Sequence, residues 1–317
     1  MATEVLADLE PLDAQFGVYP PSDVPERLED AVFGGPANTY VVLDAASLSG
    51  FHGPDAADAM EAASLFEGDA DPSNAPCLVQ VGPGSRFLRR LFTRGDAPWD
   101  HFDDAAFVIL RSAAPFAEVR AHLRRFTKCP DETGVWFYLR FFAPDLLDAL
   151  MERLRGDASR LPRWFEMPKG ARIDAWITVD AAEHVGRVHS PIYDATDLPP
   201  QAPFRLDDTY REVLEDLQDR KLIDRINAAL RHDIGLPDGT DAARDRRITG
   251  DCIRLARSYG LLSERALAHV AGVGHLRGGA LGRAELDSLG WFDDATIHPN
   301  ARARHLFDWV RKGAATP

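Results

Sequence analysis

The stretch RAHLRRFTKCPDETGVWFYLRFFAPDLL, residues 120–147, decides the fold of this chain. It begins with a basic segment of helical character, passes through a turn at Cys129 and Pro130, and then places five aromatic residues between Val135 and Phe142. The aromatics stand in consecutive rather than strictly alternating positions, which is typical of a strand buried on both faces. We therefore predict a helix, a turn and a central strand under two layers of helix.

Arg140 is the exception inside this predicted strand. A buried charge without a partner costs several kcal/mol, so a guanidinium between Leu139 and Phe141 requires carboxylates or carbonyls. We expect an internal salt bridge, for example to Asp44 on a neighbouring strand, rather than a substrate clamp.

The segments on either side alternate between strand and helix patterns. The expected strands are 39–48, 77–81, 107–112, 134–142 and 172–179, and the expected helices are 54–66, 85–94, 115–126 and 144–154. Alternation over about 140 residues predicts an α/β domain at residues 38–189, with a mixed or mainly parallel sheet and flanking helices.

The two ends of the chain have a different character. Residues 1–37 are rich in Pro, Gly and acidic residues and predict a loosely structured arm. A Pro-rich connector at 190–204 leads to residues 205–317, which show no strand pattern and predict an all-α lobe. Its expected helices are 207–235, 241–259, 263–271, 283–289 and 300–312.

The charge distribution argues against a nucleic-acid or membrane partner. The net charge of −14 lies in the first quarter, because residues 1–75 contain 15 Asp and Glu against the single base Arg27. An acidic surface repels DNA and anionic membrane. No apolar run of about 18 residues occurs, and the N-terminus lacks the basic start of a signal peptide, so we expect a soluble, cytoplasmic protein.

Motifs for nucleophiles and phosphates are incomplete. Gly82 and Gly84 precede a predicted helix, but Phe87 stands where a dinucleotide fingerprint needs its third glycine, which favours an ordinary turn. No GxSxG motif is present. The three cysteines are far apart, form no CxxC pair, and are expected to be reduced and structural: Cys77, Cys129 and Cys252.

Two clusters offer candidates for acid–base or metal chemistry, although neither has metal-site spacing. They are His101 with Asp103 and Asp104, and Glu183 with His184 and His189. The segment DADPSN, residues 69–74, begins like a calcium loop but carries Asn74 where the sharp turn needs glycine. An enzyme of unrecognised type that uses His101 or His184 remains an alternative, but we expect no metal and no cofactor.

Arg-rich helices near aromatics leave a second alternative, a module that binds single-stranded nucleic acid. The bases concerned are Arg86, Arg89, Arg90, Arg94, Arg120, Arg124, Arg125 and Lys128. Burial of the aromatic strand would remove the stacking platforms that such a module requires.

The ordered set of segments resembles the effector chaperones, or adaptors, of type VI secretion. The resemblance covers residues 38–180 and is carried most strongly by six residues that we expect to be structural: His122, Leu123, Arg124, Arg140, Phe141 and Pro144. The family typically has an acidic residue before this proline and a base after it. Ala143 and Asp145 replace them here, so we assign no binding role to those positions.

The resemblance implies a non-enzymatic role in the bacterial cytoplasm. Proteins of this family bind one toxic effector, usually encoded nearby, and help to load it onto a VgrG-type spike. The family domain carries a variable and commonly helical C-terminal extension, which residues 205–317 would provide. The expected partners are therefore an effector and the spike.

Overall fold

The computed structural model describes residues 1–13, 15, 17–48, 59–66, 75–104, 106–193, 203–235 and 241–313. The chain divides into two compact units, residues 1–214 and 215–317. The division falls within helix α6 (Asp208–Ile234) rather than in the Pro-rich connector. Of that helix, Tyr210 is buried in the first unit, whereas Ile226 and Leu230 belong to the core of the second.

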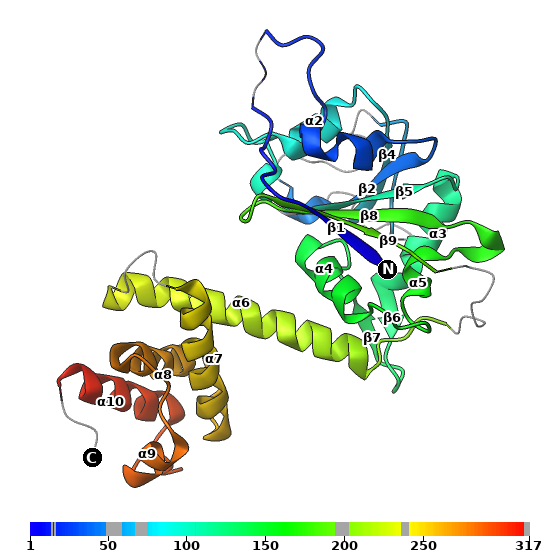
Figure 1. The fold of residues 1–317 in the computed structure, drawn as a ribbon. Helices are drawn as coiled ribbons and strands as arrows, with labels where there is room; N and C mark the ends of the chain where they lie inside the picture. The colour runs from blue at the N-terminus through cyan, green and yellow to red at the C-terminus, as the bar shows by residue number, and fades with distance from the viewer. Residues whose placement is uncertain are drawn as a thin grey trace. The chain divides into compact units, whose positions relative to one another are not determined.

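A seven-stranded sheet organises the first unit (Figure 1). Its strands, in the order β1-β9-β8-β5-β2-β4-β3, are β1 (Ala2–Leu6), β9 (Val185–Ser190), β8 (Ile173–Asp180), β5 (Phe107–Ser112), β2 (Asn38–Asp44), β4 (Pro76–Val81) and β3 (Glu61–Ser64). All neighbouring pairs are antiparallel. The prediction of a mixed or mainly parallel sheet is therefore wrong. Alternation of elements does not determine strand direction, and here β2 lies between β4 and β5 instead of leading to a parallel neighbour.

Helices cover both faces of this sheet. They are α1 (Glu29–Phe33), α2 (Arg86–Phe92), α3 (Phe116–Thr127), α4 (Pro144–Arg153) and α5 (Pro162–Phe165). Leu88 and Leu91 of α2 share a core with Val41 and Val79 of the sheet. Figure 1 shows α4 and α5 on the opposite face, where the indole of Trp176 on β8 donates to the Trp164 carbonyl of α5 at 3.1 Å.

The N-terminal segment is not the loosely structured arm that its composition predicts. β1 forms an edge of the sheet against β9, and Leu28 and Val32 lie in the core at 0% exposure. The buried Arg111 of β5 donates hydrogen bonds to the carbonyls of Gly34 and Ala37, both at 2.7 Å. These long-range contacts order a segment whose Pro and Gly content indicates a loop.

The helix predicted at 54–66 is also wrong where the structure describes it. Glu61–Ser64 forms the edge strand β3, paired with Cys77–Gln80 of β4, while residues 54–58 lie outside the described part of the chain. Short Ala-rich segments have weak strand preference, and pairing with a neighbour overrides it.

The second unit is helical throughout its described residues. It comprises the later turns of α6, then α7 (Ala242–Ser258), α8 (Glu264–Arg277), α9 (Arg283–Ser288) and α10 (Pro299–Arg311), and α8 packs against both α7 and α10. Local signals fix these ends. The Asp241 carboxylate caps α7 by accepting from the Ala243 amide at 3.1 Å, and Gly278 ends α8 with a φ of 75°.

Candidate functional site

The hairpin of β6 (Lys128–Pro130) and β7 (Trp136–Tyr138) carries the main exposed aromatic group of the first unit. Trp136, Phe137 and Tyr138 are 70%, 40% and 46% exposed. The prediction of a buried central strand at 134–142 is therefore wrong, because β7 is short and pairs with β6 outside the main sheet. Adjacent exposed aromatic side chains on a folded domain indicate an interaction surface.

A rigid turn holds this hairpin. The Asp131 carboxylate accepts hydrogen bonds from the Thr133 amide at 2.8 Å, the Thr133 hydroxyl at 2.7 Å and the Val135 amide at 2.9 Å. Gly134 takes a φ of 87°, which favours glycine. The Thr133 hydroxyl is the main cause of a lowered pKa for Asp131, with further contributions from the two amides and from Arg211. The strand is thus presented by a structured loop.

Arg140 does pair with Asp44, as its charge requires. It lies beyond the end of β7 rather than inside a buried strand, and its side chain is 53% exposed while that of Asp44 is 9% exposed. Ser47 also donates to the Asp44 carboxylate at 2.8 Å. The pair links the base of the hairpin to the end of β2 and leaves one face of the guanidinium accessible to solvent.

The other residues that carry the family resemblance are mainly architectural. Leu123 and Phe141 are completely buried, and Pro144 begins α4. His122 is 1% exposed, accepts a hydrogen bond from Arg125, and meets the ring of Phe126 edge-on. Burial, followed by the nearby Arg125 charge, lowers the pKa of His122 to about 3. A buried neutral imidazole of this kind cannot contact a partner.

Arg124 is half-buried on the same helix, α3. Behind these residues, aromatic rings from α3, α5 and the residues that precede α6 form one cluster. The Phe126 ring stacks on Trp164 at 4.4 Å between centroids, and Phe204 lies edge-on to Phe126 at 4.9 Å. The cluster gives the hairpin a stiff base.

Two of the candidate catalytic residues, Asp103 and His184, contact Arg94. No sequence motif assigned Arg94 to this site. Arg94 pairs with Asp103 at 2.7 Å, and its Nη1 lies 3.4 Å from His184 Nε2. His101 is buried and pairs with Asp104 at 2.8 Å. Asp103 is thus neutralised by a guanidinium, and His101 is turned into the fold.

Backbone contacts explain why this cluster exists. The Leu9 amide donates to the His184 carbonyl, and the Arg94 amide donates to the Leu12 carbonyl at 2.9 Å. The cluster therefore ties the N-terminal segment to the β8–β9 hairpin. Glu183 lies away from Asp103 and makes only a long ion pair with Arg187, at 3.5 Å.

His189 belongs to a separate network. Its Nε2 contacts the Asp148 carboxylate at 2.8 Å and its Nδ1 the Thr3 hydroxyl at 3.1 Å. Asp148 also accepts from Thr178 and from Arg187. No sequence pattern pointed to Asp148, because its partners come from distant strands. Its position joins α4 to β8 and β9, and through His189 to the edge strand β1.

The loop that contains Gly82 and Gly84, before α2, binds a carboxylate from elsewhere in the same chain. The Gly84 amide and the Arg89 guanidinium both bind the Asp23 carboxylate, the latter at 2.8 Å. An aspartate of the N-terminal segment thus takes the place that a phosphate would occupy in a nucleotide-binding loop. This contact agrees with the turn predicted at Gly82 and Gly84.

The thiols have no activating environment. Burial raises the pKa of the cysteines well above the physiological range: to about 12 for Cys77, about 11 for Cys129 and about 12 for Cys252. Within the described residues, no group of three or more His, Cys, Asp or Glu side chains could hold a metal ion. The segment 69–74, with its calcium-like pattern, lies outside them.

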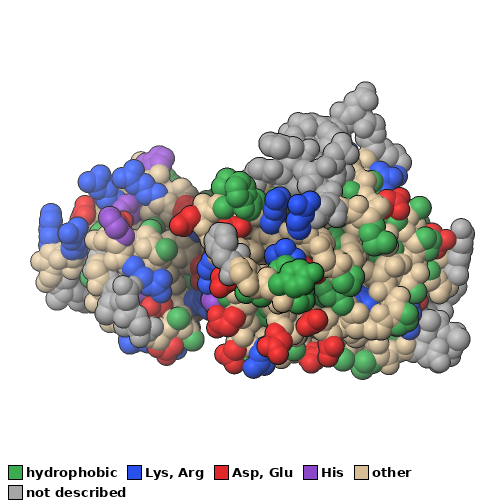
Figure 2. Space-filling view, turned by 90° about the horizontal axis from the view of Figure 1, so that it is seen from above, with side chains coloured by type: hydrophobic (Ala, Val, Ile, Leu, Met, Phe, Trp, Pro, Cys, Tyr) green, Lys and Arg blue, Asp and Glu red, His purple; other side chains and the backbone are tan. Residues whose placement is uncertain are grey.

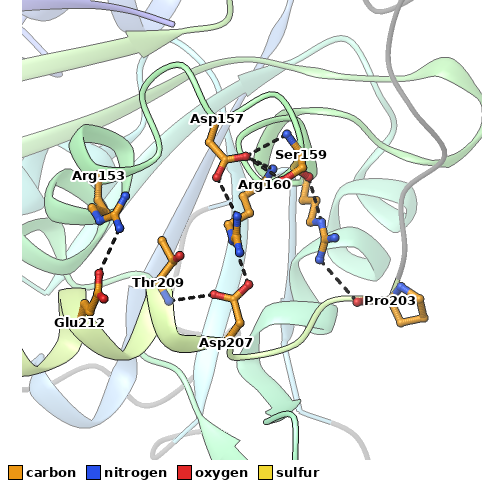
Figure 3. Close-up of polar contacts among 9 residues, drawn as sticks. Arg153, Asp157, Ser159, Arg160, Pro203, Asp207, Thr209 and Glu212 are labelled. Atoms are coloured by element: carbon orange, nitrogen blue, oxygen red, sulfur yellow. Dashed lines mark hydrogen bonds and ion pairs between the residues drawn. The ribbon is translucent and has the colours of Figure 1, made fainter.

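Ion pairs fix the start of α6 on the first unit (Figure 3). Arg160 bridges Asp157 at 2.9 Å and Asp207 at 2.8 Å, and Asp207 caps the helix by accepting from the Thr209 amide at 3.0 Å. Burial alone would raise the pKa of Asp157, but hydrogen bonds from Ser159 and Arg160 lower it to about 2.

Charges on the surface are mixed in sign. Both acidic and basic side chains appear on the face drawn in Figure 2, together with patches of hydrophobic side chains. Within the part of the chain that the structure describes, no helix combines the length and apolar composition needed to cross a membrane.

Comparison with protein-family models identifies a match to part of the chain. No curated protein and no solved structure matches the chain. Residues 39–160 match the family model described as "Domain of unknown function (DUF4123)", and the matched segment includes β2, α3, the β6–β7 hairpin and α4. The matched residues lie within the part of the chain, residues 38–180, that carries the sequence resemblance.

Proposed function

We propose that this chain is a cytoplasmic adaptor that binds one type VI secretion effector and helps to load it onto a VgrG-type spike. The match of residues 39–160 to the effector-loading domain family carries the proposal. The mechanism is binding rather than catalysis. An adaptor needs a firm scaffold and an accessible apolar surface, and aromatic and Arg side chains commonly dominate the energy of such interfaces.

Two features within or next to the matched segment support this role. The aromatic cluster around Phe126 and Trp164 is a rigid scaffold, and the β6–β7 hairpin places three aromatic side chains in solvent. The residues that would serve an enzyme are engaged with one another, since Asp103 is paired with Arg94 and His101 with Asp104.

The test is co-purification from cells that express the tagged chain with the products of its neighbouring genes. We expect the chain to retain a toxin-like protein and, in its presence, a VgrG-type spike protein. Deleting the gene should abolish secretion of that toxin but not of other effectors. His101→Asn and His184→Asn variants should support secretion normally. Failure of the wild-type chain to bind either gene product contradicts the proposal.

A further inference from the structure

The outer edge of β7 has hydrogen-bonding groups that nothing in the described part of the chain satisfies. The Asp131 amide donates to Val135 and the Leu139 amide donates to Thr127, at 2.8 and 3.1 Å. Backbone groups alternate in direction along an antiparallel strand, so Phe137 also faces β6. The N–H and C=O groups of Trp136 and Tyr138 therefore point away from β6, toward solvent.

At the opposite edge of the same hairpin, Leu206 forms an isolated parallel bridge with Asp131. The Leu206 amide donates to the Pro130 carbonyl at 3.0 Å, on the side of β6 that faces away from β7. The hairpin thus already accepts added backbone at one edge. The β7 edge offers the same groups and has the more apolar side chains.

A basic border lies beside this edge. The Lys128 Nζ lies over the Phe66 ring at 5.1 Å from its centroid, and that ring contacts Tyr138 at 5.5 Å. Arg120 donates to the Ser64 carbonyl at 2.7 Å, and no carboxylate is paired with Arg120 or Lys128 among the described residues. The two acids of this hairpin, Asp131 and Glu132, are both in the turn, at the opposite end from Lys128, and Asp131 is paired with Arg211.

This positive border contrasts with the net charge of the first unit, which is negative. Residues 215–317 contain 16 Lys and Arg against 15 Asp and Glu, so residues 1–214 carry all of the chain's net negative charge. An acidic partner is repelled by most of the unit and attracted at this border. Charge complementarity therefore selects both the place and the kind of segment that binds there.

We propose that β7 takes up an extended segment of the effector, apolar with acidic residues, as an added strand. This inference rests on the proposed adaptor function. Main-chain hydrogen bonds to Trp136 and Tyr138 hold the segment, its apolar side chains pack on the exposed rings, and its carboxylates meet Lys128 and Arg120. Single-stranded nucleic acid also binds aromatic and basic surfaces, but the net charge of the unit opposes it.

Two substitutions at one position separate the side chain from the backbone. Trp136→Ala removes an exposed ring, and we expect it to weaken effector binding by more than tenfold, as is usual for a central aromatic anchor. Trp136→Pro removes the outward N–H as well, without touching a bond to β6, and should weaken binding by about a further threefold to tenfold. Trp99→Ala, which truncates a tryptophan that is 53% exposed elsewhere, is the matched control and should bind normally.

Hydrogen exchange of the backbone amides tests directly whether β7 gains an added strand. It is measured on the full chain alone and on its complex with the co-purified effector. The amides of Trp136 and Tyr138 should exchange rapidly in the free protein and slow by at least tenfold in the complex, whereas Phe137 should be protected in both. Unchanged affinity of both Trp136 variants, with no new protection, overturns the β7 assignment and leaves the adaptor role intact. If the wild-type chain binds neither effector nor spike, the adaptor role itself fails.

Two other occupants of this edge are distinguishable. Retention of a single-stranded oligothymidylate by the wild-type chain, lost in Trp136→Ala, would assign the surface to nucleic acid. A wild-type dimer in light scattering that Trp136→Ala dissociates would assign it to a second copy of the chain. Either result overturns the proposal.

Discussion

Acidification should destabilise the first unit through the buried His122. This imidazole is 1% exposed, lies against Phe126 and accepts a hydrogen bond from the cationic Arg125, so its charged form has no favourable environment. Its pKa in the folded protein is about 3, because burial and then the Arg125 charge oppose protonation. In the unfolded chain the same side chain titrates near about 6.5.

The sign and size of the effect follow from this difference. Below about pH 6.5 the unfolded state binds a proton that the folded state does not, so the free energy of unfolding falls as the pH falls. The slope approaches about 1.4 kcal/mol per pH unit until the folded pKa is reached. Between pH 8 and pH 5, His122 alone should therefore lower the stability of the unit by about 2 kcal/mol.

Urea unfolding of the wild-type chain and of a His122→Gln variant, followed by tryptophan fluorescence from pH 8 to pH 5, measures this effect. The variant should lose stability at every pH, but it should lack the decline of about 2 kcal/mol that the wild type shows. Carboxylates and the remaining histidines are common to both proteins and cancel in the difference. If the two stability profiles run parallel, the pKa of His122 is the same in the folded and unfolded states and the reasoning is refuted.

Three further changes have distinct outcomes. Phe126→Ala should lower the free energy of unfolding by about 3–5 kcal/mol, because it opens the stacked cluster. Trp136→Ala removes an exposed ring and should change the free energy of unfolding by less than about 0.5 kcal/mol in the same urea experiment. Equal losses in the two variants would contradict the burial assigned to these rings. A double-mutant cycle of Arg160→Met and Asp207→Asn should give a coupling energy of about 0.5–1 kcal/mol that declines in high salt, and no coupling at low salt would mean that this pair does not anchor α6. The thiols should react slowly with a disulfide reagent in the native protein and rapidly in urea, since burial raises their pKa; rapid native labelling would contradict the burial of Cys77, Cys129 and Cys252.

The helices of the second unit could be predicted because local signals determine them. Asp241 and Ser263 cap two helices, and each helix begins within a residue or so of the expected position. The prediction ended α8 too early, at residue 271, because Gly272 and Gly274 resemble helix breakers. Both are buried in close contact with neighbouring helices, and the packing of small residues there outweighs their poor helix propensity.

The arrangement of the sheet depends on information that no local window contains. β1 and β9 pair across more than 180 residues, and neither was predicted, because one lies in a segment rich in Pro and acid and the other follows a short polar turn. The hydrophobic pattern of a strand shows which of its faces can be buried. It does not show which strand lies next to it, or whether the two strands run parallel or antiparallel. The predicted parallel sheet failed for this reason.

The aromatic hairpin shows the same limit on a smaller scale. Phe141 and Phe142 are completely buried, whereas Trp136 and Tyr138 are exposed, yet all belong to one run of aromatic residues in the sequence. Hydrophobicity alone does not distinguish a core strand from an interaction surface. The pairing of Arg140 with Asp44 was nevertheless predicted correctly, although the prediction placed Arg140 inside a buried strand; Arg140 is half exposed, and Asp44 is the nearly buried member of the pair.

The burial of the resembling residues also limits what a family match can say about partners. His122, Leu123 and Phe141 are enclosed in the fold and cannot touch a partner, so the residues that carry the resemblance describe a scaffold and not a binding surface. Choice of effector must come from side chains that the scaffold leaves in solvent. Because the Asp131 turn and the Phe126 cluster hold β7 rigidly, its edge can change its side chains without disturbing the core. Under the proposed adaptor function, changes at this edge would let one fold serve different effectors.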